Sequence, residues 1–224
     1  MTAADTTDFL AIHRCLRLGG RALARAVEHV DPSDRERVAA LARYWNGYTA
    51  EVLHHHGVED DIFYPALVER VPVAAEHLGR IEADHHTLDE LMAEGQVAMA
   101  ALAEGHAHHG AAAVLARLDD VMWTHLDYED ADLVPLFPLH FGHDEYERLA
   151  KGAAKSLGLK QALFTVPFVG SWVQPDVREQ MLGNAPLPFR VLYRLTRNGH
   201  ERMAAVALGG ARTQVLEDGV ERVS

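Results

Sequence analysis

One pattern occurs twice in this sequence and constrains the fold more than any other feature. A histidine stands four residues before a glutamate, an aspartate follows the glutamate, and a proline comes six residues after it. The first copy runs from His55 to Pro65 and the second from His125 to Pro135. Side chains four residues apart lie one turn apart on the same face of an α-helix. Each copy therefore predicts a helix that presents an imidazole and a carboxylate to one point, as a helix does when it supplies two metal ligands.

Four segments in the first 140 residues carry apolar residues at alternating steps of three and four, which is typical of amphipathic helices. We expect these helices over about residues 7–30, 38–65, 73–104 and 114–135. Each apolar stripe includes one histidine, and the first two helices are echoed by the third and fourth. Two helical hairpins related by a pseudo-twofold axis would bring these side chains together inside a four-helix bundle, as in di-metal carboxylate proteins.

The residues on these stripes predict a metal site and restrict the kind of metal. One histidine on an apolar stripe is more often a packed core residue than a ligand, but four such histidines with two carboxylates favour metal binding. A buried carboxylate needs a metal, a cationic partner or a shifted pKa. Cys15 is the only cysteine, which excludes an iron–sulfur cluster and disfavours a cysteine-rich zinc site. Four imidazoles and two carboxylates that can bridge suit two iron or manganese ions with open positions. The predicted ligands are His13, His55, Glu59, His85, His125 and Glu129.

Several neighbouring residues are candidates for an additional ligand or a supporting contact. His56 flanks the apolar stripe of its helix, so we expect it to be more exposed than a stripe residue. Asp130 can either pair with an arginine on the outside or reach inward, and Tyr48 and Tyr128 lie within one or two turns of the ligands. Acidic residues surround His86 on the helix, so we expect it on the surface. The candidates are Asp89, His56, Asp130, Tyr128 and Tyr48.

Composition restricts the partners and the compartment. The formal net charge of −12 gives no electrostatic support for binding nucleic acid or anionic membranes. The polar, acidic N-terminus has no signal-peptide pattern, and one cysteine suits a reducing compartment. The longest apolar run, about residues 162–173, is too short to span a bilayer. We therefore expect a cytoplasmic monomer or homodimer that binds neither nucleic acid nor membrane.

The pattern changes after residue 142, and we predict an all-α fold with three parts. Residues 1–142 form the four-helix bundle with up-down-up-down topology and the di-metal site. Residues 143–208 form a helical extension, in which residues 159–174 read as an apolar connector. Residues 209–224 have the composition of a flexible tail.

The ligand pattern resembles the hemerythrin-like HHE family over about residues 8–140. This resemblance implies a four-helix bundle that holds two iron ions (Fe2+/Fe3+) with an oxo or hydroxo bridge, in which Glu59 and Glu129 also bridge. Manganese and zinc rank below iron. The C-terminal helices are similar to an extension on many bacterial members. Oxygen-carrying hemerythrins have a further histidine where this chain has Asp89, and fewer imidazoles favour higher oxidation states of iron, which argues against stable reversible oxygen carriage.

The leading functional hypothesis is a non-haem di-iron protein that binds or reacts with O2, peroxide or NO. It would act as a sensor, a scavenger or a weak catalase-like enzyme, roles connected with oxygen binding and oxidative stress. The alternatives are an iron-storing or iron-sensing module without turnover, and a helical scaffold that binds a partner. The sequence does not distinguish an enzyme from a sensor or a storage protein.

Overall fold

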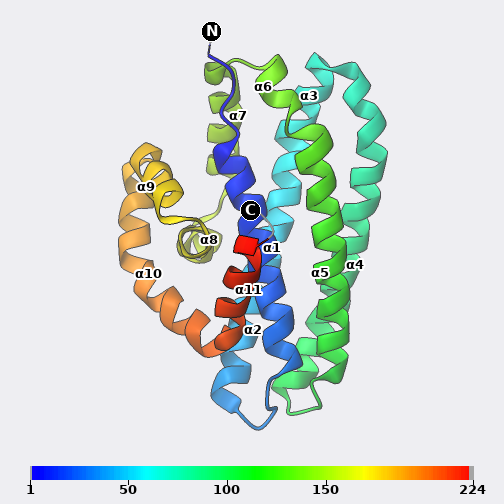
Figure 1. Cartoon of the computed structure of the whole chain (residues 1–224), viewed down its shortest axis with the longest axis vertical. Coiled ribbons are helices and arrows are strands. Elements are labelled where there is room, and N and C mark those ends of the chain that lie inside the picture. Colours follow the sequence, from blue (N-terminus) through cyan, green and yellow to red (C-terminus); the bar gives the residue numbers. More distant parts are fainter. Residues whose placement is uncertain (1, 222–224) are drawn as a thin grey trace.

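Four long helices form the body of the protein, whose computed structural model describes residues 2–221 (Figure 1). The elements are α1 (Thr7–Glu28), α2 (Arg35–Val58), α3 (Tyr64–Arg70), α4 (Ala75–Ala103) and α5 (His109–Tyr128). Short turns join α1 to α2 and α4 to α5 at one end of the bundle, while α3 leads from α2 towards α4 at the other (Figure 1). Both α1 and α4 pack against α2 and α5. The predicted all-α, up-down-up-down four-helix bundle is confirmed.

Three short turns of other helix types complete the bundle. Two are π-helical and directly continue α2 and α5, so that the chain stays helical through each repeated motif. The third is a 3-10 turn that leads into α4. They are η1 (Glu59–Phe63), η2 (Pro72–Ala74) and η3 (Glu129–Leu133). In the part of the chain that the structure describes, no helix is long and apolar enough to cross a membrane.

Two apolar clusters divide the interior of the bundle. The main core joins buried residues of α1, α2, α4 and α5 with residues of the C-terminal helices. The second cluster, which we call the aromatic cluster, lies at the end where α3 connects the helices. Its aromatic members are Phe9, Phe63, Tyr64, Phe137, Phe141 and Tyr146. On α4, His85 follows Ile81 of the aromatic cluster by one turn and precedes Leu88 of the main core by one turn. A buried polar layer therefore separates the two apolar clusters.

Further helices follow η3, and several of them pack on the α1–α2 side of the bundle. They are α6 (Leu136–His140), α7 (His143–Ser156), α8 (Leu159–Trp172), α9 (Pro175–Asn184), α10 (Leu187–Leu208) and α11 (Gly210–Glu221). α8 contacts α1 and α2, α10 contacts α2 and α8, and α11 contacts α1. The ribbon places α8 and α10 beside the bundle, with α11 across α1 (Figure 1). The division of the chain into two domains at residue 142 stays a prediction.

The structure corrects two expectations for this region. Residues 159–172 form a helix rather than a connector, because one side of α8 packs on the bundle. Residues 210–221 form α11 rather than a flexible tail, while residues 222–224 lie outside the described part. Ala211 and Val215, one turn apart, are buried in the main core, and Arg25 pairs with Asp218 at 2.8 Å. The apolar pair gives the terminal helix a face to bury on α1.

Close contacts and buried hydrogen bonds join α8 to the bundle. The ring of Phe164 lies where a side chain at Gly47 would stand. Trp172 Nε1 donates a hydrogen bond to the Tyr44 hydroxyl at 3.0 Å. The buried carboxylate of Glu51 accepts a hydrogen bond from Thr165 of α8, and burial raises the pKa of Glu51 to about 7. The C-terminal extension thus shares both apolar and polar contacts with the interior of the bundle.

Replacing Gly47 by alanine tests this packing. A Cβ at position 47 would stand 2.2 Å from a ring carbon of Phe164, so we expect Gly47→Ala to lower the free energy of unfolding by about 1–3 kcal/mol. Gly199 of α10 is the matched control because a Cβ there meets no atom within 4 Å. Gly199→Ala should raise the free energy by about 0.5–1 kcal/mol through helix propensity. Urea unfolding of both variants measures this, and equal stabilisation would contradict the α2–α8 packing.

Candidate metal centre

Six buried side chains from the four bundle helices converge in the polar layer. They are His13, His55, Glu59, His85, His125 and Glu129, with relative exposures between 0% and 7%. Two overlapping groups form, in each of which the potential ligand atoms lie within 4.8 Å of one another. The first group contains His13 and His55, the second contains His85 and His125, and both glutamates belong to both groups. This arrangement provides two adjacent positions for metal ions that share two carboxylates.

The two π turns explain how each motif presents its glutamate. Glu59 begins η1 and Glu129 begins η3, so each ligand stands where the helix widens. The amide of Val134 donates to the Glu129 carbonyl at 2.9 Å, which is the five-residue hydrogen bond of a π turn. A proline follows each turn and has no amide hydrogen for an ordinary helical bond. The helical chain nevertheless continues past Pro65 as α3, because the wider turn accommodates the proline.

The ring nitrogens of the converging histidines face the carboxylates. The distance from Nε2 of His55 to Glu59 Oε1 is 3.2 Å, and that from Nε2 of His125 to Glu129 Oε2 is 3.4 Å. Nε2 of His13 lies 3.5 Å from a Glu59 oxygen and 3.7 Å from a Glu129 oxygen. These three nitrogens, Nε2 of His85 and the facing carboxylate oxygens are buried but have no hydrogen-bond partner. Because unpaired buried polar atoms are costly, this convergence fits a site built to bind cations.

The aspartate after each glutamate supports a histidine from the other half of the bundle. Asp130 lies 2.6 Å from Nδ1 of His13 and also pairs with Arg17 at 2.7 Å. Asp60 lies 3.2 Å from Nδ1 of His85. A hydrogen bond from Nδ1 to a carboxylate orients the ring and leaves Nε2 as a lone-pair donor. Asp130 therefore does both things that the sequence left open, because it pairs with an arginine and also reaches inward to a histidine.

Burial keeps the histidines in the neutral form that a metal site requires but disfavours the charged form of the glutamates. It lowers the pKa of His125 to about 2 and also lowers the pKa values of the other three ligand histidines. The imidazoles thus stay neutral and can donate a lone pair. Burial raises the pKa of Glu129 to about 8, and burial together with the charge of Glu129 raises the pKa of Glu59. A cation between the carboxylates would favour their charged forms and offset this penalty.

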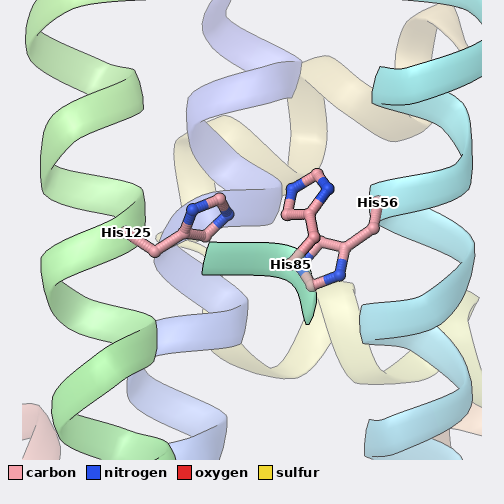
Figure 2. Close-up of side chains that lie close together, drawn as sticks. All are labelled: His56, His85 and His125. Carbon is pink, nitrogen blue, oxygen red and sulfur yellow. The ribbon is translucent and has the colours of Figure 1, made fainter. Parts of the chain in front are cut away.

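His56 is buried, contrary to the expectation that it would be exposed. It is 4% exposed, and its ring stacks on that of His85 with centroids 3.9 Å apart. The expectation failed because α2 packs against neighbours on several sides, so that residues away from its apolar stripe, such as Glu51, are also buried. His56, His85 and His125 form a third group of converging side chains (Figure 2).

The structure places the other candidates away from the ligand atoms. Asp89 is exposed on α4, and Tyr128 lies 2.6 Å from Nδ1 of His77. The Tyr48 hydroxyl donates to a main-chain carbonyl of α1 in the main core. His86 is exposed and pairs with Glu90 at 3.2 Å, as expected for a surface residue. Among the described residues, neither Asp89 nor His86 belongs to a converging group.

Tyr64 is a contact of the centre that sequence reasoning missed. It is 2% exposed, and its hydroxyl donates a hydrogen bond to Glu129. Its place directly after the π turn gives it access to both carboxylates, but the second motif has Val134 at the corresponding position. The repeat therefore gave no signal for it.

A surface cleft adjoins the centre. It has a volume of about 470 Å3 and lies between η1, α3 and α4, where Asp60, Tyr64 and Ile81 are among its lining residues. Asp60 contacts His85 and Tyr64 contacts Glu129, so two residues of the cleft wall also touch the ligand set. This cleft therefore brings solvent to two side chains that contact the converging residues.

Comparison with known proteins agrees with this geometry. The model of the hemerythrin HHE cation binding domain matches residues 5–137 and so includes all six converging residues. No curated protein and no solved structure matches the chain. Because the family model covers more than half of the sequence, the chain belongs to the hemerythrin HHE cation-binding family.

Proposed function

We propose that this protein holds two iron ions and binds or reacts with a small ligand of the class of O2, peroxide or NO. The observation that carries the proposal is the pair of overlapping ligand groups that share Glu59 and Glu129. His13 and His55 would hold one ion, and His85 and His125 the other. Bound iron would supply the redox chemistry and an open coordination position.

The donor chemistry supports iron. Neutral imidazoles and carboxylates suit iron, and these carboxylates can bridge two ions. The one thiol, of Cys15, donates to the Val169 carbonyl at 3.7 Å, and burial raises its pKa. It belongs to none of the converging groups, so the site has no thiolate of the kind that structural zinc usually takes.

The surroundings of the centre support a small ligand. Phe9 packs against two ligand histidines, with ring centroids 4.7 Å from His13 and 5.9 Å from His55. Such an apolar wall excludes water, which suits diatomic molecules and limits side reactions of a redox-active metal. The cleft beside Asp60 and Tyr64 brings small molecules from solvent to the side chains that contact His85 and Glu129. We infer a sensor, scavenger or weak catalase-like enzyme.

Metal content and absorption test the proposal directly. Protein expressed in iron-replete medium should contain about two irons per chain and show near-ultraviolet charge-transfer absorption when oxidised, because the ligands can hold two adjacent ions. Elemental analysis and a spectrum of the freshly purified protein measure both. One tightly bound zinc and no iron would overturn the assignment. Peroxide consumption by the iron-loaded protein then separates a reactive centre from iron storage.

Two neighbouring histidines on α4 provide a matched test of the ligand set. His85 faces Glu59 with its Nε2 at 3.6 Å, whereas His86 is exposed. Adjacent residues differ by about 100° around a helix, so the two rings cannot reach the same ion. We expect His85→Ala to lose about one iron per chain and most peroxide consumption, and His86→Ala to keep both.

The same measurement can contradict the assignment. Should His86→Ala lose iron while His85→Ala retains the content of the wild-type protein, the ligand set on α4 is wrong. Circular dichroism of both variants shows whether the helices are retained.

A further inference from the structure

His56 is a buried imidazole whose two ring nitrogens lack hydrogen-bond partners. The residue is 4% exposed, and both Nδ1 and Nε2 are buried without forming a hydrogen bond. Buried histidines normally have such partners, as His13 has in Asp130 and His85 has in Asp60. In the second motif the corresponding residue is Leu126, which is fully buried in the main core. An apolar side chain is thus compatible with this kind of position, and the polar ring of His56 needs a separate explanation.

The position of the ring supplies that explanation. His56 lies in a group with His85 and His125 in which one nitrogen of each residue comes within 4.8 Å of the others. Figure 2 shows the three rings reaching the same space from α2, α4 and α5. The ring of His56 is nearly perpendicular to that of His125 but nearly parallel to that of His85, with an angle of 12° between the planes. An imidazole donates its lone pair within the plane of its ring, so the His56 ring must turn out of this stack before it can bind the same ion as His85. Three neutral imidazoles from three helices are a common ligand set for a transition-metal ion.

Packing alone does not account for the arrangement. Stacking on His85 would explain a flat ring at position 56, but it gives neither nitrogen a partner. Phenylalanine would stack equally well without burying two polar atoms. A cation bound to one nitrogen would supply the missing interaction.

We propose that His56 is a seventh protein ligand, which joins His85 and His125 on one of the two metal ions. The inference rests on the proposed two-ion centre and makes its positions unequal. One ion would have three imidazoles and the other two, from His13 and His55, while the glutamates serve both. The repeated motif therefore builds a centre whose two halves differ in affinity for metal.

Anaerobic titration with Fe2+ tests the proposal by binding rather than by activity. Two variants separate ligation from packing: His56→Leu introduces the residue found at position 126, and His56→Phe keeps a ring that can stack on His85. His54→Leu is the control, since His54 is a half-buried neighbour outside the converging groups whose Nε2 lies 3.1 Å from the Ser156 hydroxyl. Calorimetry gives the number and affinity of the sites, and 57Fe Mössbauer spectra report how many iron environments exist.

Ligation predicts two Fe2+ sites in the wild-type protein and in His54→Leu, with two distinct iron environments. In both His56 variants, one site should weaken by about tenfold or more, or be lost. If the wild-type protein and His56→Phe both bind two ions with equal affinity, the ring only packs and this inference is overturned while the two-ion centre stands. If the wild-type protein binds fewer than two ions, the proposed centre fails and the inference fails with it.

Discussion

Two carboxylates buried side by side impose the condition that the rest of the bundle meets. Glu59 and Glu129 are inaccessible to solvent and lie between two apolar clusters, where like charges repel strongly. Neutral imidazoles from all four helices surround them, but these groups cannot neutralise a pair of carboxylates. A bound cation can, and the matched family is a family of cation-binding domains. The polar layer that interrupts the core is therefore explained by what it binds, since apolar residues would pack there at lower cost.

The internal repeat explains how a single chain encloses such a layer. The aspartate after each glutamate holds a histidine from the opposite half, Asp60 with His85 and Asp130 with His13. Each half thus orients the ligands of the other, and neither hairpin can form the centre alone. The two motifs differ at the position of His56. We infer that the two metal positions are therefore unequal. Unequal positions would let the two ions load in order and divide different tasks between them.

The features of this structure that could be predicted from the sequence are those that helical periodicity determines. Helix spacing identified the bundle, and histidines on apolar stripes indicated the six converging residues, because both depend only on local geometry. Burial of His56 escaped prediction because α2 is covered on several sides, which a single stripe does not reveal. The π turns and Tyr64 depend on how proline is accommodated after each glutamate, and α11 depends on a short apolar pair that only tertiary packing makes stable.

Thermal unfolding with and without metal tests the central claim that buried carboxylates and bound cations stabilise each other. Circular dichroism should follow the iron-loaded protein and the same protein after strong chelation, at one pH and one protein concentration. The account predicts that chelation lowers the Tm by about 10 °C or more, because metal binding contributes directly to folding free energy. A chelated protein that unfolds within about 1–2 °C of the loaded form, a shift worth about 1 kcal/mol or less, would contradict it.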